Sequence, residues 1–419
     1  MKQKIAIIGS GISGLTCAYL LRNQYDVTLY EQNDYFGGHT HTQSVSVSDG
    51  TFPVNTGFIV FNDWTYPNFI KLMQQLGVES EESDMSFSVQ CANTGLEYNG
   101  TTLNSLFAQR RNLLRPAFWG MVRDILRFNK EATAAFLAGS IDQNITLGQY
   151  LQNEKYGDWF KRYFIIPMGA AIWSASEKAM MDFPFYFFVR FFHHHGMLSV
   201  DKRPVWRVLK GGSHSYVQKI TALLGDACHL NRAVTAVQRH ASGVTVSDNQ
   251  GQQLEYDQVI FACHSDQALA MLRDASPQEQ EILSAIPYQN NDVVLHTDTR
   301  LLPQRPLAWA SWNYFIPRQA QESVSVTYNM NILQNFKSDT TFCLTLNRSA
   351  DIDPAKIIRR FNYAHPTFTL AGIAAQQRHA EISGTELHSH YCGAYWFNGF
   401  HEDGVKSALR VCSALGVEL

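Results

Sequence analysis

Residues 4–31 read KIAIIGSGISGLTCAYLLRNQYDVTLYE, and this stretch decides the fold. An apolar run at 4–8 leads into a glycine-rich turn, then into an apolar segment with helical spacing, and then into a second apolar run at 26–30 that ends at Glu31. The order strand, glycine turn, helix, strand predicts a βαβ unit with parallel strands. We therefore expect an α/β fold of the Rossmann type.

The three glycines of this turn stand in the spacing GxGxxG. Gly9 permits the tight turn, Gly11 lets the backbone approach a pyrophosphate, and Gly14 lets helix and strand pack closely. The helix N-terminus offers free N–H groups and the positive end of a dipole to the phosphates. Glu31 stands where a carboxylate accepts a ribose 2′-hydroxyl and repels a 2′-phosphate. The stretch predicts a dinucleotide site.

Two further segments favour FAD over NAD as the dinucleotide. A second glycine pair, Gly37 and Gly38, follows Glu31 closely, as a longer cofactor crossing the site would require. Near the other end of the chain, GFHEDGVKSAL at 399–409 supplies a second helix N-terminus. Such a dipole end suits the negative charge that collects at N1 and the C2 carbonyl of a reduced flavin.

Composition excludes several classes of protein. The 419 residues are 45% hydrophobic and 17% charged, which is typical of a folded enzyme and not of a disordered chain. The net charge of −3 gives no reason to expect nucleic acid as a partner. Seven cysteines without a CxxC pair argue against a disulfide framework or a zinc ribbon and favour a reducing compartment. No apolar run approaches a membrane span, so we expect a cytoplasmic protein.

The chain contains no long linker or repeat, so we expect its domains to be interleaved. Helices are predicted at 65–77 and 105–135, an aromatic segment lies at 183–195, and β-rich sequence fills 290–345. The predicted organisation is a Rossmann-type FAD-binding domain and an α+β substrate domain with a helical region at 105–195. The FAD-binding domain takes 1–75, 205–270 and 385–419, and the substrate domain takes 76–204 and 271–384.

Several segments together resemble the FAD-dependent amine oxidoreductase superfamily, which includes monoamine and polyamine oxidases, protoporphyrinogen oxidase and phytoene desaturase. The likeness rests on residues 4–21, on YEQNDYFGGHTHT at 30–42, on FPVNTGFIVF at 52–61, on VLKGGSHSYV at 208–217, on QLEYDQVIFAC at 253–263 and on 399–409. A bacterial branch of predicted FAD/NAD-binding proteins, often encoded beside cyclopropane-fatty-acid synthase-like genes, is the most similar. The resemblance implies an amine-oxidase-like two-domain fold.

The resemblance also assigns cofactor contacts. Some monoamine oxidases attach their flavin to a cysteine, but the sequence around Cys392 does not match theirs, so we expect FAD without a covalent link. The ADP half of FAD would meet Gly9, Gly11, Gly14, Glu31, Gly37 and Gly38, and the adenine would meet Val234. The flavin would lie beside Gly57 and Phe58 and at the start of the last helix, at Glu402, Asp403, Gly404 and Val405. His39 stands where the family usually has an arginine, so a group that titrates replaces a permanent cation.

One residue expected of an amine oxidase is missing. Such enzymes usually carry a lysine near flavin N5 on a strand of the substrate domain, but this chain has no lysine between Lys219 and Lys337. This absence argues against a standard amine oxidase. His296 lies near the corresponding position, and we consider it for a proton-handling role, with an ordinary core histidine as the alternative.

Aromatic residues are the other candidates for the catalytic side. Tyr395 and Trp396 precede the predicted flavin-facing helix and are the preferred choices, with core packing as the alternative. Further candidate wall residues are Trp173, Trp309, Trp312, Tyr314 and Tyr391. Three HxH pairs, at 39/41, 193/195 and 388/390, lack a carboxylate or cysteine to complete a ligand set, so we expect no metal site.

The segment 105–135 interleaves six cationic residues with aromatic ones. This pattern suits either peripheral contact with anionic lipid at the inner membrane face or a solvated helix face. The sequence does not determine the oligomeric state.

Taken with the flavin site, these features predict an FAD-dependent oxidoreductase that removes two hydrogens from an apolar, lipid-like substrate by hydride transfer to flavin N5. Amine oxidation is the second hypothesis, and a non-catalytic FAD-binding module is the third.

Overall fold

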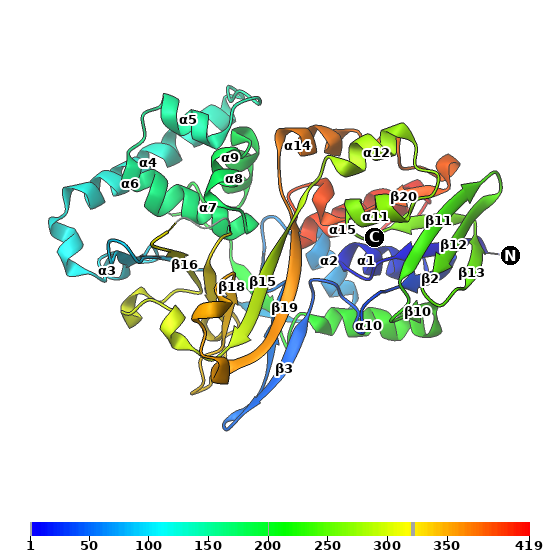
Figure 1. Ribbon diagram of the computed structural model, residues 1–419, viewed down its shortest axis with the longest axis horizontal. Coiled ribbons are helices and arrows are strands. Elements are labelled where there is room, and N and C mark those ends of the chain that lie inside the picture. The colour runs from blue at the N-terminus through cyan, green and yellow to red at the C-terminus, as the bar shows by residue number, and fades with distance from the viewer. Residues whose placement is uncertain (1, 200, 320–322) are drawn as a thin grey trace.

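The computed structural model describes residues 2–199, 201–319 and 323–419. Figure 1 shows two parts side by side. One part is built on a parallel sheet near both chain ends, and the other joins a long mixed sheet to a group of helices. Among the described residues, no helix is both long and apolar enough to cross a bilayer.

The first part is organised by a five-stranded sheet in the order β10-β2-β1-β14-β20, with every neighbouring pair parallel. Its central strand carries apolar residues on both faces, as parallel strands covered on both sides require. The strands are β1 (Lys4–Ile8), β2 (Asp26–Tyr30), β10 (Cys228–His229), β14 (Gln258–Phe261) and β20 (Ser389–Tyr391).

Alternate residues of β1 enter two different cores. Ile5 and Ile7 pack with the helices on one face of the sheet, whereas Ala6 and Ile8 pack with a three-stranded antiparallel sheet on the other. The helices of this part are α1 (Ile12–Leu21), α2 (Pro67–Gln75), α10 (His214–Leu224), α11 (Ser265–Met271), α12 (Pro277–Ser284) and α15 (His401–Ala414). The covering strands are β11 (Val234–His240), β12 (Gly243–Asp248) and β13 (Gln253–Tyr256).

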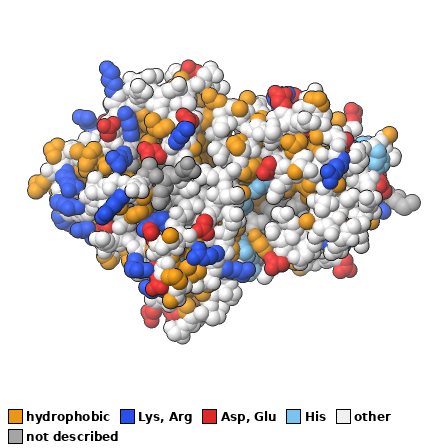
Figure 2. Space-filling model, viewed as in Figure 1, with side chains coloured by type: hydrophobic (Ala, Val, Ile, Leu, Met, Phe, Trp, Pro, Cys, Tyr) orange, Lys and Arg blue, Asp and Glu red, His pale blue; other side chains and the backbone are white. Residues whose placement is uncertain are grey.

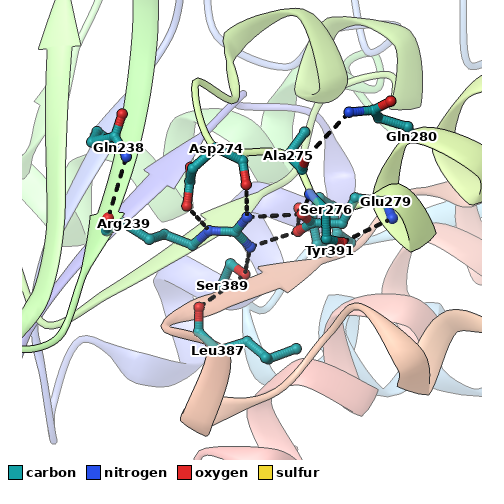
Figure 3. A network of polar contacts seen from close by, with 10 residues as sticks. All are labelled: Gln238, Arg239, Asp274, Ala275, Ser276, Glu279, Gln280, Leu387, Ser389 and Tyr391. Carbon is teal, nitrogen blue, oxygen red and sulfur yellow. Dashed lines mark hydrogen bonds and ion pairs between the residues drawn. The ribbon is translucent and has the colours of Figure 1, made fainter.

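A buried ion-pair network ties the covering sheet to the parallel sheet (Figure 3). Arg239 of β11 donates to Glu279 of α12 at 2.6 Å and to Asp274 at 2.8 Å. The Tyr391 hydroxyl of β20 donates to the same Glu279 at 2.7 Å. Burial raises the pKa of Glu279, but the hydrogen bonds from Arg239 and Tyr391 outweigh it and hold that pKa below its ordinary value. Three elements are thereby fixed around one carboxylate.

The second part is organised by a seven-stranded sheet in the order β19-β15-β18-β17-β16-β7-β8. Only the β16–β7 pairing is parallel. The strands are β7 (Phe87–Cys91), β8 (Glu97–Asn99), β15 (Tyr288–His296), β16 (Trp312–Ile316), β17 (Val326–Asn329), β18 (Cys343–Leu346) and β19 (Ile357–Pro366).

Helices between residues 103 and 194 lie against one end of this sheet (Figure 1). They share with the sheet one large core, rich in phenylalanine and tyrosine. They are α3 (Leu103–Leu106), α4 (Pro116–Leu137), α5 (Leu147–Asn153), α6 (Asp158–Phe160), α7 (Ile166–Trp173), α8 (Glu177–Met181) and α9 (Phe185–His194).

Short pairings and helices complete the fold. Strands β3 (Thr42–Val47) and β4 (Gly50–Asn55) form a ribbon, and β9 (Trp206–Leu209) lies between β5 (Phe61–Asn62) and β6 (Ser80–Glu82). Two further short helices, α13 and α14, span Met330–Leu333 and Leu370–Gln377. The chain thus passes repeatedly between the two parts, while the domain boundaries given above stay a prediction.

We expect Glu279→Gln to lower the free energy of unfolding by about 3 kcal/mol, measured by urea denaturation. This is the lower end of the range for breaking a buried ion pair, because Asp274 still faces Arg239. The control is Glu281→Gln on the same helix, where the carboxylate is 66% exposed and pairs with Arg378 at the surface. That change should cost less than about 1 kcal/mol. Equal losses in the two variants would contradict a structural role for the network.

Candidate functional site: a flavin cavity

One cavity of about 760 Å³ joins the two parts of the protein. Its walls come from the ends of β1 and β2, from residues 37–39 and 56–60, from α7, from the long mixed sheet and from residues 393–401. The volume lies within the range of small-molecule and cofactor sites. Ligands of open α/β sheets bind at the carboxyl ends of the strands, and this cavity begins there.

In the first glycine turn, two glycines are needed for the packing of the fold and one leaves space for a ligand. A Cβ on Gly14 would lie 1.9 Å from the Gly9 carbonyl oxygen, and one on Gly9, where φ is +102°, would lie 2.8 Å from the carbonyl oxygen of Ala262. A Cβ on Gly11 would meet nothing within 4 Å. Gly9 and Gly14 are therefore required by packing, whereas the space in front of Gly11 is left for a ligand.

The second glycine turn lies directly against the first. Gly38 has a φ of +58°, and a Cβ there would lie 3.3 Å from the Gly11 Cα. Gly57 is pressed against this turn in the same way, since its Cβ would lie 2.1 Å from the His39 carbonyl oxygen. The next residue, Phe58, stacks its ring on that of His401 with centroids 3.4 Å apart. All six residues line the cavity.

Glu31 lines the cavity, but both of its carboxylate oxygens already have partners. One accepts the Ser10 backbone N–H at 3.0 Å and the Ser10 hydroxyl at 2.5 Å. The other accepts the backbone N–H and the side-chain amide of Asn33, each at 2.9 Å. These bonds occupy the four lone-pair directions of the carboxylate, so a ribose hydroxyl has to share or displace one of them.

Val234, the residue predicted to meet the adenine, lies in the cavity wall. It lines the cavity together with Arg232, whose backbone N–H donates to the Glu31 carbonyl oxygen at 2.9 Å. The Arg232 guanidinium pairs with Asp248 at 2.6 Å, and so its charge is already compensated inside the protein.

Four histidines line the cavity, and only His39 was predicted. The ring of His39 lies 6.2 Å from that of His264 and 5.2 Å from that of His365. Burial lowers the pKa of His39 and His264 to about 4 and that of His365 to about 3, and it lowers the pKa of His401 well below its ordinary value. These imidazoles are neutral in the ligand-free protein. They come from four distant segments, which no sequence spacing connects.

The last helix meets the cavity earlier than predicted. Asn398, Gly399, Phe400 and His401 line the wall, whereas Glu402, Asp403, Gly404 and Val405 are not among the lining residues. Glu402 instead accepts backbone N–H groups at the start of α2, and Asp403 accepts the Phe400 N–H at 3.0 Å. Gly404 packs on α1, where its Cβ would lie 2.5 Å from Ile12.

Burial raises the pKa of Asp403 to about 7, although the Phe400 N–H that it accepts opposes this shift. The first-turn N–H groups of α15 remain at the edge of the cavity without partners inside the helix, as at any helix start.

Of the three predicted catalytic residues, the structure brings one to the cavity. Tyr395 lines it, and its hydroxyl is buried without a hydrogen-bond partner. Trp396 is buried against the ring of His379 and is not part of the wall. His296 is completely buried on β15, where Nε2 lies 2.7 Å from the Thr345 hydroxyl and Nδ1 accepts the Asp298 N–H at 3.0 Å. Both ring nitrogens have partners outside the cavity wall, so His296 fits the alternative of an ordinary core histidine.

The apolar end of the cavity combines predicted and unpredicted side chains. Among the predicted aromatic wall residues, Trp173 and Trp312 line it, whereas Trp309, Tyr314 and Tyr391 do not. The wall also takes in Ile172, Tyr328, Leu344, Leu346, Phe368 and Phe400. Tyr328, Leu344 and Leu346 lie on strands of the mixed sheet, where the inward face depends on a register that only the fold reveals.

No group of three or more His, Cys, Asp or Glu side chains is arranged to hold a metal ion in the described part of the chain.

A family model described as flavin containing amine oxidoreductase matches residues 12–338. The chain belongs to this family. Membership confirms the predicted superfamily, the flavin cofactor and the FAD-dependent oxidoreductase class. The fold is confirmed by a putrescine oxidase triple mutant, which superposes with a TM-score of 0.70 at 15% identity over 99% of this chain and 98% of that one.

Two named relatives align over parts of the sequence. A 1-hydroxycarotenoid 3,4-desaturase of Flavobacterium sp. strain P99-3 is 30% identical over 157 residues, which are 36% of this chain and 26% of the desaturase. AofH of Mycobacterium tuberculosis, named as a flavin-containing monoamine oxidase, is 23% identical over 265 residues, 59% of this chain and 54% of that protein. The chain thus aligns with about a quarter and about half of their lengths.

The cavity residues fit a bound FAD. The space before Gly11, the N-terminus of α1 and the adjoining turn at Gly38 suit a pyrophosphate. Phe58 and the start of α15 would hold the flavin end. Trp173, Trp312, Tyr395 and His39 each bring a buried, unpartnered polar atom to the same walls, which is consistent with a site built around a ligand.

We expect Gly11→Ala to leave the fold intact and to weaken FAD binding. The backbone at Gly11 has a φ of −63°, which any residue adopts, and its Cβ direction is open, so only the ligand competes for the space. Gly14→Ala is the control, because its Cβ would collide with the Gly9 carbonyl and destabilise the protein itself. Thermal unfolding of the apoprotein and titration with FAD separate the two effects. Wild-type FAD affinity in Gly11→Ala would contradict the placement.

We expect FAD binding to take up a proton at His39. His39 faces the rings of His264, His365, His401 and Tyr363 and bonds to the backbone of Ala364, and no carboxylate contributes to its pKa. A nearby phosphate favours the charged imidazole, so the pKa of His39 should rise in the complex from about 4 toward the ordinary histidine range. Because binding raises this pKa, FAD affinity should be highest at low pH and fall as pH rises through that range.

Calorimetry in buffers of different ionisation enthalpy measures this uptake. His39→Arg, which is charged at every pH, should abolish it, whereas His240→Gln, at an exposed position on β11, should not. Unchanged proton uptake in His39→Arg would assign the proton to another group.

Proposed function

We propose that this protein is an FAD-dependent oxidoreductase that removes two hydrogens from an apolar, lipid-like substrate. The observation that carries the proposal is the distribution of charge along the cavity. Among the lining residues, the only Asp, Glu, Lys or Arg side chains are Glu31 and Arg232, and both lie beside the glycine turns. The opposite end is walled by aromatic and aliphatic side chains.

These walls select and orient a substrate by burial. Trp312 and Tyr328 pack edge to face at 4.8 Å on adjacent strands, and Trp173 is held by Phe183 and Phe191 at 4.5 and 4.8 Å. Burying each methylene of a chain against such walls contributes about 0.8 kcal/mol. The same walls exclude water from the reacting carbon. A bound flavin supplies the acceptor for the hydride.

The named desaturase relative supports the choice of an apolar substrate, since its name gives a carotenoid as the molecule that it oxidises. Amine oxidation is the second candidate, because the family and the putrescine oxidase fold both point to amines. An ammonium substrate has no carboxylate to meet at the apolar end and would depend on the faces of Trp173, Trp312 and Tyr395. The charge distribution therefore favours the apolar substrate.

The test is anaerobic reduction of the FAD-loaded protein. Mixed bacterial lipids should bleach the oxidised flavin absorbance, whereas putrescine and benzylamine should not. Bleaching by the amines alone would support amine oxidation. No bleaching by either class of compound would support the third hypothesis, a non-catalytic FAD-binding module.

We further expect Ile172→Glu to slow bleaching by lipid at least tenfold with unchanged FAD content, because it places a charge in the apolar wall. Leu223→Glu, at a side chain 58% exposed on α10, is the matched control and should behave as the wild type.

A further inference from the structure

Large apolar side chains are exposed along one segment of the helical region. Of the fourteen that are exposed among the described residues, six lie between residues 103 and 137. The most exposed are Leu114 at 88% and Leu103 at 78%. We call the exposed face formed by this segment the α4 surface. Its apolar members are Leu103, Leu113, Leu114, Trp119, Leu126 and Leu137.

Helix α4 presents two different faces. On the inward face, Phe118, Met121 and Phe128 belong to the large core and are completely or almost completely buried. The outward face carries residues 119, 123, 126, 130 and 137, whose spacing places them in one stripe along the helix. That stripe reads Trp, Arg, Leu, Lys, Leu, so apolar and cationic side chains alternate on it. A helix face that only contacts water is not stabilised by exposing Trp119, Leu126 and Leu137.

Four of the six cations of the α4 surface have no carboxylate partner in the described part of the chain, whereas Arg123 lies 3.8 Å from Asp124 and Arg127 lies 3.2 Å from Glu131. Arg110, Arg111 and Arg115 donate to the neutral oxygens of Phe107, Gly95 and Asn112. In the described ranges, no ion pair involves these three arginines or Lys130. Segment 103–137 holds six cationic residues and two carboxylates, although the whole chain has a net charge of −3. One of these carboxylates, on Asp124, is buried, and the other, on Glu131, pairs with Arg127.

The surface is held rigidly in place. The Trp119 indole N–H donates to the Leu113 carbonyl oxygen at 3.0 Å, and its ring lies 5.3 Å from that of Phe107. The Thr102 capping box fixes the start of α3, next to Leu103. Figure 2 shows the resulting group of hydrophobic and basic side chains at the end of the molecule that carries α3 and α4 in Figure 1.

From these contacts we infer that the α4 surface binds the face of an anionic phospholipid bilayer. Leu103, Leu114 and Trp119 enter the boundary between headgroups and acyl chains, and the arginines meet the phosphates. Interfacial binding combines buried apolar area with attraction of cations to anionic lipid, and this surface supplies both. A nucleic acid would use the arginines but would leave the exposed leucines in water.

The bilayer surface goes beyond the proposed reaction and does not depend on it. The helical region that carries the surface also contains α7, whose Ile172 and Trp173 line the apolar end of the cavity. A lipid-bound protein would hold this region nearest to the acyl chains. Vesicle binding needs no turnover, so its failure would leave the flavin-bleaching result and the proposed function untouched.

The experiment is co-sedimentation of the FAD-loaded protein with vesicles of phosphatidylcholine alone or mixed with phosphatidylglycerol. The wild type should bind the mixed vesicles more tightly and should release with added salt. Arg110→Gln/Arg111→Gln/Arg115→Gln should weaken binding to the mixed vesicles on the order of 100-fold, at about fivefold for each cation. Leu103→Ser/Leu114→Ser should weaken it at least tenfold and keep the preference for anionic lipid.

Matched controls change the same residue types elsewhere. Lys2→Gln/Arg273→Gln/Arg360→Gln alters three exposed cations, and Leu223→Ser/Leu254→Ser alters leucines that are 58% and 42% exposed. Both should bind as the wild type does. Quenching of tryptophan fluorescence by brominated lipid should fall in Trp119→Phe, which locates the contact. Equal binding to both vesicle types, no binding, or an equal loss in the control variants would overturn the inference.

Discussion

The structure depends on how closely the backbone packs around the start of α1. The helix approaches β1 so closely that Gly14 touches the Gly9 carbonyl, Gly38 brings the second turn against Gly11, and Gly404 lets α15 lie on Ile12. A side chain at Gly14 or Gly404 would separate two elements of the fold. Segments from both ends and from the middle of the chain therefore converge on one helix N-terminus, and the cavity begins at the point where they meet.

This packing also explains the unusual electrostatics of the site. The backbone supplies the positive end of a helix dipole, while the lining side chains supply neutral imidazoles and one arginine that is already paired. A permanent cation in place of His39 would lie beside three other histidines in a buried space with no carboxylate to balance it. Neutral imidazole avoids that cost in the ligand-free protein and can still take a proton when a phosphate arrives.

The glycine motifs of the sequence lie at one end of the cavity, and their contacts with the cofactor stay a prediction. Gly9, Gly11 and Gly38 have a local signature, because a tight turn or a close approach restricts a single position to glycine. Glu31 could also be located, but its bonds to Ser10 and Asn33 could not, since they depend on side-chain rotamers. The predictions for residues 402–405 found the correct helix and missed its cavity-facing end by one turn, because Glu402 and Asp403 act as caps.

The substrate half was hard to predict for a different physical reason. His296 and Trp396 lie close in sequence to residues that do line the cavity, but strand register and burial turn them into the core. The wall is assembled from α7, the five strands β15 to β19 of the mixed sheet and the loop before α15, so no single stretch of sequence encodes it.

A wall of this kind can change its lining residue by residue without disturbing the glycine contacts around the start of α1. The family description names amines, whereas one partial relative is named as a carotenoid desaturase, so the nature of the substrate has to be read from the wall and not from the motif.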